Sequence, residues 1–493
     1  MRLPQSIAPL FVTPERRRVL LALATGSMLV QMSSLPVALS LPTLADEFNV
    51  DIDVAAWIVI AYLLAIGSGA MLGARIGDRY GHARVFFVGI LGSTLGAGLI
   101  VISQNLLEVV AFRALSGLGA ALIIGNANAI LVSAFPVGER GRAFSIPIIG
   151  SRIGTLSGLA TFGLSLEFAT WRIAFLSFLP IGLIATFTAY RMMRHEKLEA
   201  DRPSGHIDYL GGILLVAAAV TLVLSTNHLH GGDESFTTSE AISYHVPMQI
   251  LFLFLVALFI LVERRVKNPV VDLRHFRNKY FSLSLVSNTA FHFSMLAAFT
   301  LVPIVMEEGF GLTPLFVMLV LVPNQSMGIF LPLIGGSLYD KHGSRLFRPG
   351  AMVVIAMGFL ILGLTVAHIP AWTVPLIMLP ITAGTSIFNP INNATVMSSL
   401  PMEHRGVASG MLETTRELGH ALGATVSATA LSMFLPEFIS TLSETEAQGF
   451  YLDGFRFACL MVVGILIAGA VVAYFHKAIK QPATPAPIPA EAA

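Results

Sequence analysis

The sequence carries little charge for its length. Only 12% of the 493 residues are Asp, Glu, Lys or Arg, whereas 55% are hydrophobic. An average soluble domain has about 25% charged residues, and about half of that fraction is too little to keep a chain of this length dissolved. The composition therefore excludes an ordinary water-soluble enzyme and predicts that much of the surface faces lipid.

Cysteine is also nearly absent. The single residue, Cys459, excludes a disulfide framework and any cysteine-based zinc or iron–sulfur site. The net charge of +1 provides no field that would attract nucleic acid. The sequence has no H-E-x-x-H, G-x-S-x-G or G-x-x-x-x-G-K-[ST] motif, which argues against a membrane-embedded enzyme and against nucleotide hydrolysis. We expect no enzyme activity, no metal, no cofactor and no nucleic-acid partner.

Fourteen apolar stretches are long enough to cross a membrane. A helix needs about 20 residues to span ~30 Å of hydrocarbon. Runs such as residues 213–224 are apolar nearly all round and lack the period of two of a transmembrane barrel strand. We therefore predict an all-helical membrane protein with fourteen transmembrane helices. They cover residues 19–41, 54–73, 84–103, 107–133, 143–166, 173–192, 208–228, 247–264, 281–305, 313–338, 348–368, 372–396, 406–434 and 455–475.

The distribution of basic residues predicts the orientation. Of the 30 Lys and Arg residues, 25 lie in the N-terminal arm, in every second connection or in the C-terminal segment, and the intervening connections are acidic. Lys and Arg are retained on the cytoplasmic side of a membrane. Both termini are therefore predicted to face the cytoplasm of a bacterial-type inner membrane. The first span is too long for a cleaved signal peptide.

Three landmarks recur at nearly one offset. Residues 74–84, ARIGDRYGHAR, are echoed by residues 336–345, GSLYDKHGSR, 262 positions later, and two further segments repeat after 261 and 265 positions. Two six-helix halves of the same topology are thus predicted, joined by an extra helix pair. The expected domains are residues 1–18 (cytoplasmic arm), 19–200 (N-terminal bundle), 201–275 (inserted pair and linkers), 276–475 (C-terminal bundle) and 476–493 (disordered cytoplasmic tail).

Residues 74–84 resemble G-x-L-x-D-R-x-G-R-R, the signature loop of the major facilitator superfamily, and residues 113–119, RALSGLG, resemble its R-x-x-Q-G-x-G motif. With fourteen spans and the segments 208–211 and 268–273 around the inserted pair, the chain is similar to the 14-span drug:proton antiporter branch. The resemblance implies the major facilitator fold, with two pseudo-symmetric six-helix bundles, a substrate site between them at mid-membrane, and alternating access.

In this family the signature loop acts as a conformational latch. An acidic residue at the end of one helix can meet the positive N-terminus of a helix in the other half, here near Gly406, and basic residues bridge neighbouring helix ends. The alternative is that the charges only set the topology. The expected latch residues are Asp78, Arg79, Gly81 and Arg84, with Asp340, Lys341, Gly343 and Arg345 in the second half.

The thirteenth span carries four ionisable residues on one helical face. Glu413, Arg416, Glu417 and His420 are spaced i, i+3, i+4 and i+7. Ionisable groups in hydrocarbon are costly and are functional hypotheses by default, so a carboxyl beside Arg416 is a candidate proton acceptor. The alternative is an ion cluster that only locks helices together. In the fourth span, Arg113 matches an arginine that the family links to proton exchange. The alternative interpretation is that the Arg113 side chain only extends to the outer membrane interface.

Polar residues in the cavity-lining spans that the family implies, the first and fourth of each half, are candidates for substrate binding. Amides and hydroxyls within a membrane can bind solutes, and they can equally join helices. The candidates are Gln31, Ser33, Asn126, Asn128, Asn288, His292, Asn389, Asn392 and Asn393.

Two family motifs are altered. The branch usually has an aspartate in the first span where this chain has Ser33, and a serine exchanges no proton at physiological pH. The G-P-x-x-G-G motif of the fifth span becomes GTLSGL at residues 154–159 and loses its proline. We assign Arg152, Gly154 and Gly158 in this span to helix packing or switching. A proton carrier is then expected at Glu413 or Glu417, assisted by His292 or His420.

The predicted function is secondary active transport, with proton-coupled export of drugs or other amphipathic molecules as the first interpretation. Transport of a specific, anionic metabolite is the second, because Arg113, Arg152 and His292 favour an anion. A cavity with unpaired Glu413 or Glu417 would favour cations. A passive channel is less consistent with duplicated latches. We expect a monomer in the bilayer that moves a small molecule and protons, and recruitment of a periplasmic adaptor protein is left open.

Overall fold

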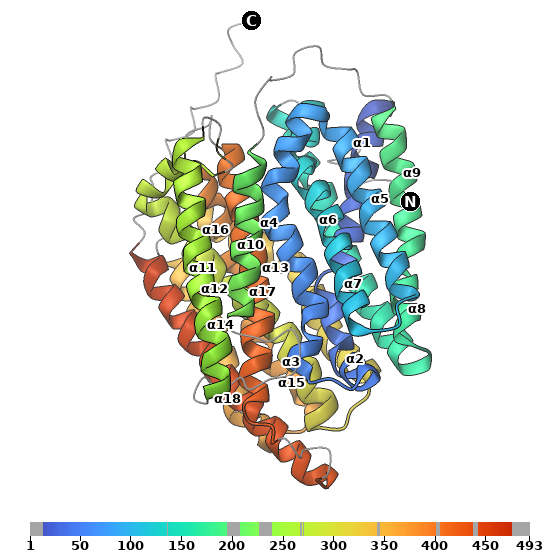
Figure 1. Cartoon of the computed structure of the whole chain (residues 1–493), viewed down its shortest axis with the longest axis vertical. Helices are drawn as coiled ribbons and strands as arrows, with labels where there is room; N and C mark the ends of the chain where they lie inside the picture. The colour runs from blue at the N-terminus through green and yellow to red at the C-terminus, as the bar shows by residue number, and fades with distance from the viewer. Residues whose placement is uncertain are drawn as a thin grey trace, which may run out of the picture.

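The structure is a computed structural model of the chain, and it is built of helices (Figure 1). It describes residues 13–135, 137–194, 208–225, 239–266, 269, 271–342, 346–400, 405–436 and 442–475. No strand occurs in these ranges. The expected C-terminal tail, most of the N-terminal arm, and the latch residues Gly343 and Arg345 lie outside them.

The N-terminal half follows the predicted order, and its helices extend beyond the predicted apolar cores. The first span is interrupted because α1 ends at Met32 and a short 3₁₀ helix with Pro36 follows. Its elements are α1 (Pro14–Met32), η2 (Leu35–Ser40), α2 (Leu41–Phe48), α3 (Ile52–Ala55), α4 (Trp57–Tyr80), α5 (His82–Val101), α6 (Leu106–Ala134), α7 (Val137–Phe168), α8 (Trp171–Leu176) and α9 (Phe178–Met193).

The inserted pair is α10 (Tyr209–Leu224) and α11 (Ser239–Arg265). The C-terminal half begins with the short η3 (Leu273–Arg277) and repeats the arrangement of the first. Its elements are α12 (Lys279–Ile304), η4 (Val305–Gly309), α13 (Pro314–His342), α14 (Phe347–Thr365), η5 (Val366–His368), η6 (Ala371–Thr373), α15 (Val374–Ile377), α16 (Leu379–Ser398), α17 (Arg405–Ser432) and α18 (Glu444–Tyr474). Each of the fourteen predicted stretches falls on one of these helices or on consecutive ones.

Local sequence signals fix several helix ends. The side chain of Asn105 accepts a hydrogen bond from the backbone N–H of Glu108 and so caps α6. Asn278 caps α12 in the same way, and Ser443 with Glu446 forms a capping box at α18. Between α4 and α5 the chain turns at Gly81, whose φ of 97° favours glycine.

Within the described ranges, ten helical segments are long and apolar enough to cross a membrane, and α10 and the first part of α13 are shorter apolar helices. The helices α7 and α17, which carry charged residues including Arg152 and Glu417, are not among these twelve. The chain is therefore an all-helical, multi-pass membrane protein.

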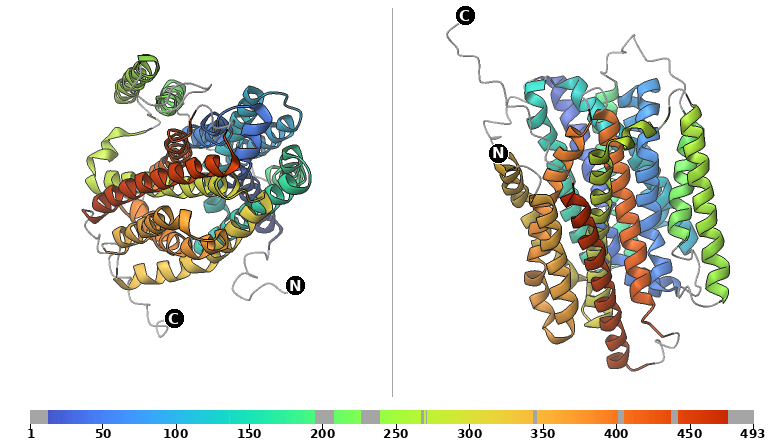
Figure 2. Two further views of the ribbon diagram at one scale, coloured as in Figure 1. Left: turned by 90° about the horizontal axis from the view of Figure 1, so that it is seen from below. Right: turned by 90° about the vertical axis from the view of Figure 1, so that its left-hand side faces the viewer.

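Two helix pairs make the most extensive contacts between the halves. α4 packs against α17, and α7 packs against α13. α10 packs against α4 and α17, whereas α11 contacts mainly α10, so the inserted pair lies at the outside of the bundle (Figure 2). The inserted pair thus covers the α4–α17 seam from one side.

The duplicated loops lie at the same end of the molecule. α13 begins beside η2 and η4, and η2 and α2 also contact α12. α4 begins at the same end, because α3 follows α2 directly in the chain. Both helices run away from this end, so Tyr80 and His342, at their C-terminal ends, lie at the opposite one. This is the arrangement that two parallel repeats require.

Candidate functional site: an ionic cluster between two helices and two halves

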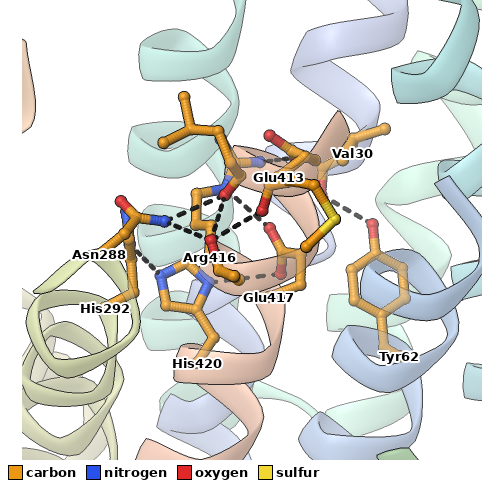
Figure 3. Close-up of polar contacts among 11 residues, drawn as sticks. Val30, Tyr62, Asn288, His292, Glu413, Arg416, Glu417 and His420 are labelled. Carbon is orange, nitrogen blue, oxygen red and sulfur yellow. Dashed lines mark hydrogen bonds and ion pairs between the residues drawn. The ribbon is translucent and has the colours of Figure 1, made fainter. Parts of the chain in front are cut away.

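The four ionisable residues of α17 meet in one cluster (Figure 3). Arg416 lies between two carboxylates: its Nη2 donates to Glu413, and its Nε donates to Glu417 Oε1 at 2.9 Å. The Glu417 side chain is 4% exposed, and that of Arg416 is 28% exposed. Glu413 precedes Arg416 by three residues and Glu417 follows it by one. The Arg416 side chain is long enough to reach both.

The cluster continues through two histidines to α12. Glu417 Oε2 lies 3.3 Å from His420 Nδ1, and His420 Nε2 lies 3.0 Å from His292 Nδ1. Both imidazoles are buried. Neutral imidazole donates with one nitrogen and accepts with the other, so the chain from Glu417 to His292 is continuous for hydrogen bonding.

Amides join the same helices next to the cluster. Asn288 of α12 donates through Nδ2 to Leu412 O and to Thr415 Oγ1 of α17, each at 3.0 Å. Asn392 of α16 donates to Asn288 Oδ1 at 2.9 Å. These two candidate substrate residues are buried and hold α12, α16 and α17 together.

The cluster touches the other half of the protein at Gly67 of α4. A Cβ added to Gly67 would lie 2.8 Å from Glu417 Cβ and 3.5 Å from the backbone of α17. Glycine therefore allows the two helices to approach at the level of the buried carboxylate. A charge change at Glu417 is thus adjacent to the surface along which the halves meet.

Arg113 is completely buried and does not extend to the outer interface. Its Nε donates to Ile58 O at 2.7 Å, and its Nη1 donates to Ser33 O and Ser33 Oγ at 2.8 Å. Its guanidinium lies 4.2 Å above the Tyr62 ring, and Tyr62 in turn donates to Val30 O at 2.9 Å. The bonds to Ser33 O and Val30 O satisfy backbone groups freed where α1 ends. Arg113 therefore connects α6, α4 and the interrupted first span, and Ser33 is its direct partner.

The glycines of α7 pack against α1. A Cβ at Gly154 would lie 2.3 Å from Met28 O, and one at Gly158 would lie 2.6 Å from Pro36 Cγ. Arg152 lies on another face of α7, near Gly328 of α13. Gly154 and Gly158 thus set the spacing of two helices within one half, while Arg152 lies next to the other half.

The remaining candidate binding residues do not form one group. Asn126 is buried and donates to Gly73 O and Leu122 O, at 3.0 and 2.8 Å. Asn128 and Asn393 are exposed, and Gln31 and Asn389 are partly buried. Asn126 therefore joins α6 to α4 beneath the signature loop.

The first signature loop forms a local network. Asp78 is exposed and pairs with His82, with 3.4 Å between Oδ1 and Nε2. His82 Nδ1 lies 2.7 Å from Asn126 Oδ1. Arg79 and Arg84 are exposed. Among the residues that the structure describes, the ion-pair partner of Asp78 is His82. In the second half the backbone of Asp340 and Lys341 is helical, and their side chains are outside the described part.

Sequence reasoning missed the roles of Tyr62 and His82. Tyr62 is a polar aromatic residue in an otherwise apolar span, which marks it as unusual but names no partner. His82 stands in the signature loop at a position where the family motif has a basic residue, which names no partner either. Both contacts join helices that are distant in sequence, so no local spacing reveals them.

This fold, its duplicated loops and its buried polar cluster define a secondary transporter. Residues 21–424 match the model of the Major Facilitator Superfamily. The chain belongs to this superfamily.

Curated relatives are moderately similar over most of their length. The riboflavin transporter RibZ of Clostridioides difficile (strain 630) is 26% identical over 405 residues, which cover 82% of this chain and 86% of that protein. The multidrug resistance protein Stp of Mycobacterium tuberculosis (strain CDC 1551 / Oshkosh) is 26% identical over 418 residues, covering 84% and 76%. Relatives thus include proteins named for a vitamin and for drugs.

Solved structures share the fold. A bacterial homologue of the human lysosomal transporter Spinster, in an inward-facing and unoccupied conformation, has a TM-score of 0.65 at 16% identity, covering 94% of this chain and 97% of that one. A D-xylose–proton symporter has a TM-score of 0.63 at 13% identity, covering 93% and 97%. These likenesses concern the fold alone.

Proposed function

We propose that the protein exports amphipathic small molecules by proton-coupled alternating access. The observation that carries this proposal is the hydrogen-bonded chain from Glu413 to His292. It holds two carboxyls within the helical body, and one of them, Glu417, lies against Gly67 of the other half. Buried ionisable residues that face other helices mark ion pathways in membrane proteins.

A proton on a carboxyl of the cluster would change the contact between the halves. Protonation of Glu417 removes one of the two charges that Arg416 bonds. The freed guanidinium then favours a different arrangement of the α17 side chains, beside Gly67. A two-state element biased in this way is sufficient for coupling. Arg113 is assigned to the same coupling step through its bonds to the interrupted first span.

The proposal includes the topology and the branch. Adding α10, α13, α7 and α17 to the ten long apolar segments gives fourteen spans, as in the 14-span drug:proton antiporter branch. α7 and α17 are 32 and 28 residues long, which is sufficient to span despite their charged residues. We propose a monomer in a bacterial inner membrane with both termini in the cytoplasm.

The test is uptake into inverted membrane vesicles energised by a proton gradient. The probes are ethidium, riboflavin and tetracenomycin C, because relatives are named for drugs, for riboflavin and for tetracenomycin C. Accumulation of at least one probe, abolished by a protonophore, is expected. Accumulation that survives the protonophore, or accumulation of none of the three, contradicts the proposal.

Glu417→Gln separates coupling from movement. The variant keeps the size of the side chain and should equilibrate the probe downhill without concentrating it. Glu15→Gln on the exposed first turn of α1 is the matched control and should behave as the wild type. Normal concentrative uptake by Glu417→Gln would remove Glu417 from the mechanism.

Transport of a specific metabolite is the second candidate function. It is favoured by the riboflavin transporter among the relatives, and by the charge distribution, since Arg113 and Arg152 form no ion pair within the described residues. The same vesicles distinguish the candidates. A single probe that is accumulated and is not displaced by the others favours a specific metabolite, whereas mutual competition favours drug export.

A further inference from the structure

Arg152 occupies the middle of a helix between the two halves. It is the sixteenth of the 32 residues of α7, and its Nη1 lies 3.7 Å from where a Cβ of Gly328 would be, close to the middle of α13. Gly150, Gly154 and Gly158, spaced by four, pack against α1 on one face of α7. Arg152 is two positions away from both Gly150 and Gly154 in the helix. Its side chain therefore points away from α1 and toward the contact with α13.

Within the described part of the chain, the guanidinium of Arg152 has no counter-charge. No hydrogen bond or ion pair to Arg152 occurs among the described residues, and no described charge lies close enough to interact with it. Arg416, by contrast, is bonded to two membrane-embedded carboxylates, Glu413 and Glu417. A charge this deep in a bilayer protein is costly when it is uncompensated.

Exposed apolar side chains share a helix face with Arg152. Ile148 and Ile149, four and three residues before it, share its face of the helix and are 59% and 46% exposed. Arg152 itself is partly buried. The cationic group therefore lies beside exposed apolar side chains, and its Nη1 lies 3.7 Å from the Cβ position of Gly328 on the opposite helix.

We propose that Arg152 binds the anionic group of the transported molecule, and that the substrate class is an aromatic or aliphatic organic anion. A planar guanidinium makes two parallel hydrogen bonds to a carboxylate, sulfonate or phosphate, while the apolar part of the ligand lies on the isoleucines. The two glutamates of α17 are engaged by Arg416, so a cationic ligand finds no unpaired carboxylate there. This inference rests on the proposed transport function and specifies its substrate.

Thermal unfolding of the purified full-length protein tests this inference. The probes are 2-naphthoate, 2-naphthylmethanol and 2-naphthylmethylammonium, which share one ring system and differ in charge. A ligand stabilises the folded state in proportion to its occupancy. Naphthoate should raise the melting temperature more than the neutral and cationic probes at equal concentration and ionic strength. Equal shifts from all three probes, or a larger shift from the cation, would overturn the proposal.

Arg152→Gln should abolish the advantage of naphthoate, with its Kd raised by about tenfold or more, as expected for the loss of a charge-assisted hydrogen bond. Arg152→Lys should retain part of it. Arg191→Gln on α9 is the matched control and should bind naphthoate as the wild type does. Retention of the naphthoate shift in Arg152→Gln would refute the assignment.

Two further readouts separate this inference from its premises. Without ligand, Arg152→Gln should melt no lower than the wild type, because an uncompensated charge has been removed. A lower melting temperature would show instead that Arg152 stabilises the fold through a partner. Glu417→Gln should keep the naphthoate shift even if it loses proton-driven uptake. Failure of coupling and failure of anion recognition therefore give different results.

Discussion

The packing of α7 on α1 leads to a sharp prediction about Gly154. Replacing it with alanine would place a methyl carbon 2.3 Å from Met28 O and 2.9 Å from Met28 Cα. A carbon and a carbonyl oxygen rarely approach closer than about 3.3 Å, so the helices must separate by about 1 Å. The obstacle is backbone and cannot rotate away.

The cost follows from two effects. Overpacking a tight contact costs about 1–3 kcal/mol. A gap of about 1 Å forfeits roughly half of the dispersion energy of the atoms that separate. The glycines on either side cannot compensate, because their own contacts also open: a Cβ would lie 2.3 Å from Ala24 O at Gly150 and 2.9 Å from Met32 O at Gly158.

The assay is the fraction of protein that stays monodisperse in detergent after heating. Gly154→Ala should lower the midpoint of this curve by several degrees. Gly464→Ala on α18 is the control, because a Cβ there meets nothing within 4 Å, and alanine is the better helix former by about 1 kcal/mol. The reasoning is refuted if Gly154→Ala is as stable as Gly464→Ala.

Two other substitutions test single contacts. Arg113→Met removes the guanidinium bonds to Ser33 O, Ser33 Oγ and Ile58 O and should cost about 2–4 kcal/mol, whereas Ser33→Ala loses one of these bonds and should cost about 1 kcal/mol, both measured by thermal unfolding. Equal losses would show that the backbone bonds contribute nothing. Gly77→Ala places a Cβ 1.6 Å from Asn126 Oδ1 and should destabilise the protein, while Gly350→Ala, with open space, should not.

Local sequence was informative wherever the responsible forces are local. Apolar runs of about 20 residues located the helices because the hydrocarbon thickness sets a length. The spacing of Glu413, Arg416, Glu417 and His420 placed them on one face, and the structure brings them into one cluster. The offset of about 262 residues indicated two like halves, and α4 and α13 indeed end at the same side of the molecule.

Cross-helix partners were not accessible to the same reasoning. Asn126 was a substrate candidate by its span, but its amide is directed to Gly73 and its oxygen to His82. Ser33 was seen as a lost proton site, and in the structure it bonds Arg113. Which polar residues contact each other depends on the rotation of each helix about its axis and on the angle at which helices cross. An apolar span determines neither quantity, because all of its faces are equally soluble in lipid.

The sequence alone determined that the chain is a helical membrane protein with a duplicated loop and an ionic stripe, because hydrophobic length and helical period act within one segment. Tertiary structure alone decided that Arg416 bonds both glutamates, that Arg113 bridges three helices, and that Arg152 has no counter-charge among the described residues. The reason is physical: pairing of charges in a low-dielectric interior is a property of distance in space, and only the packed helices set that distance.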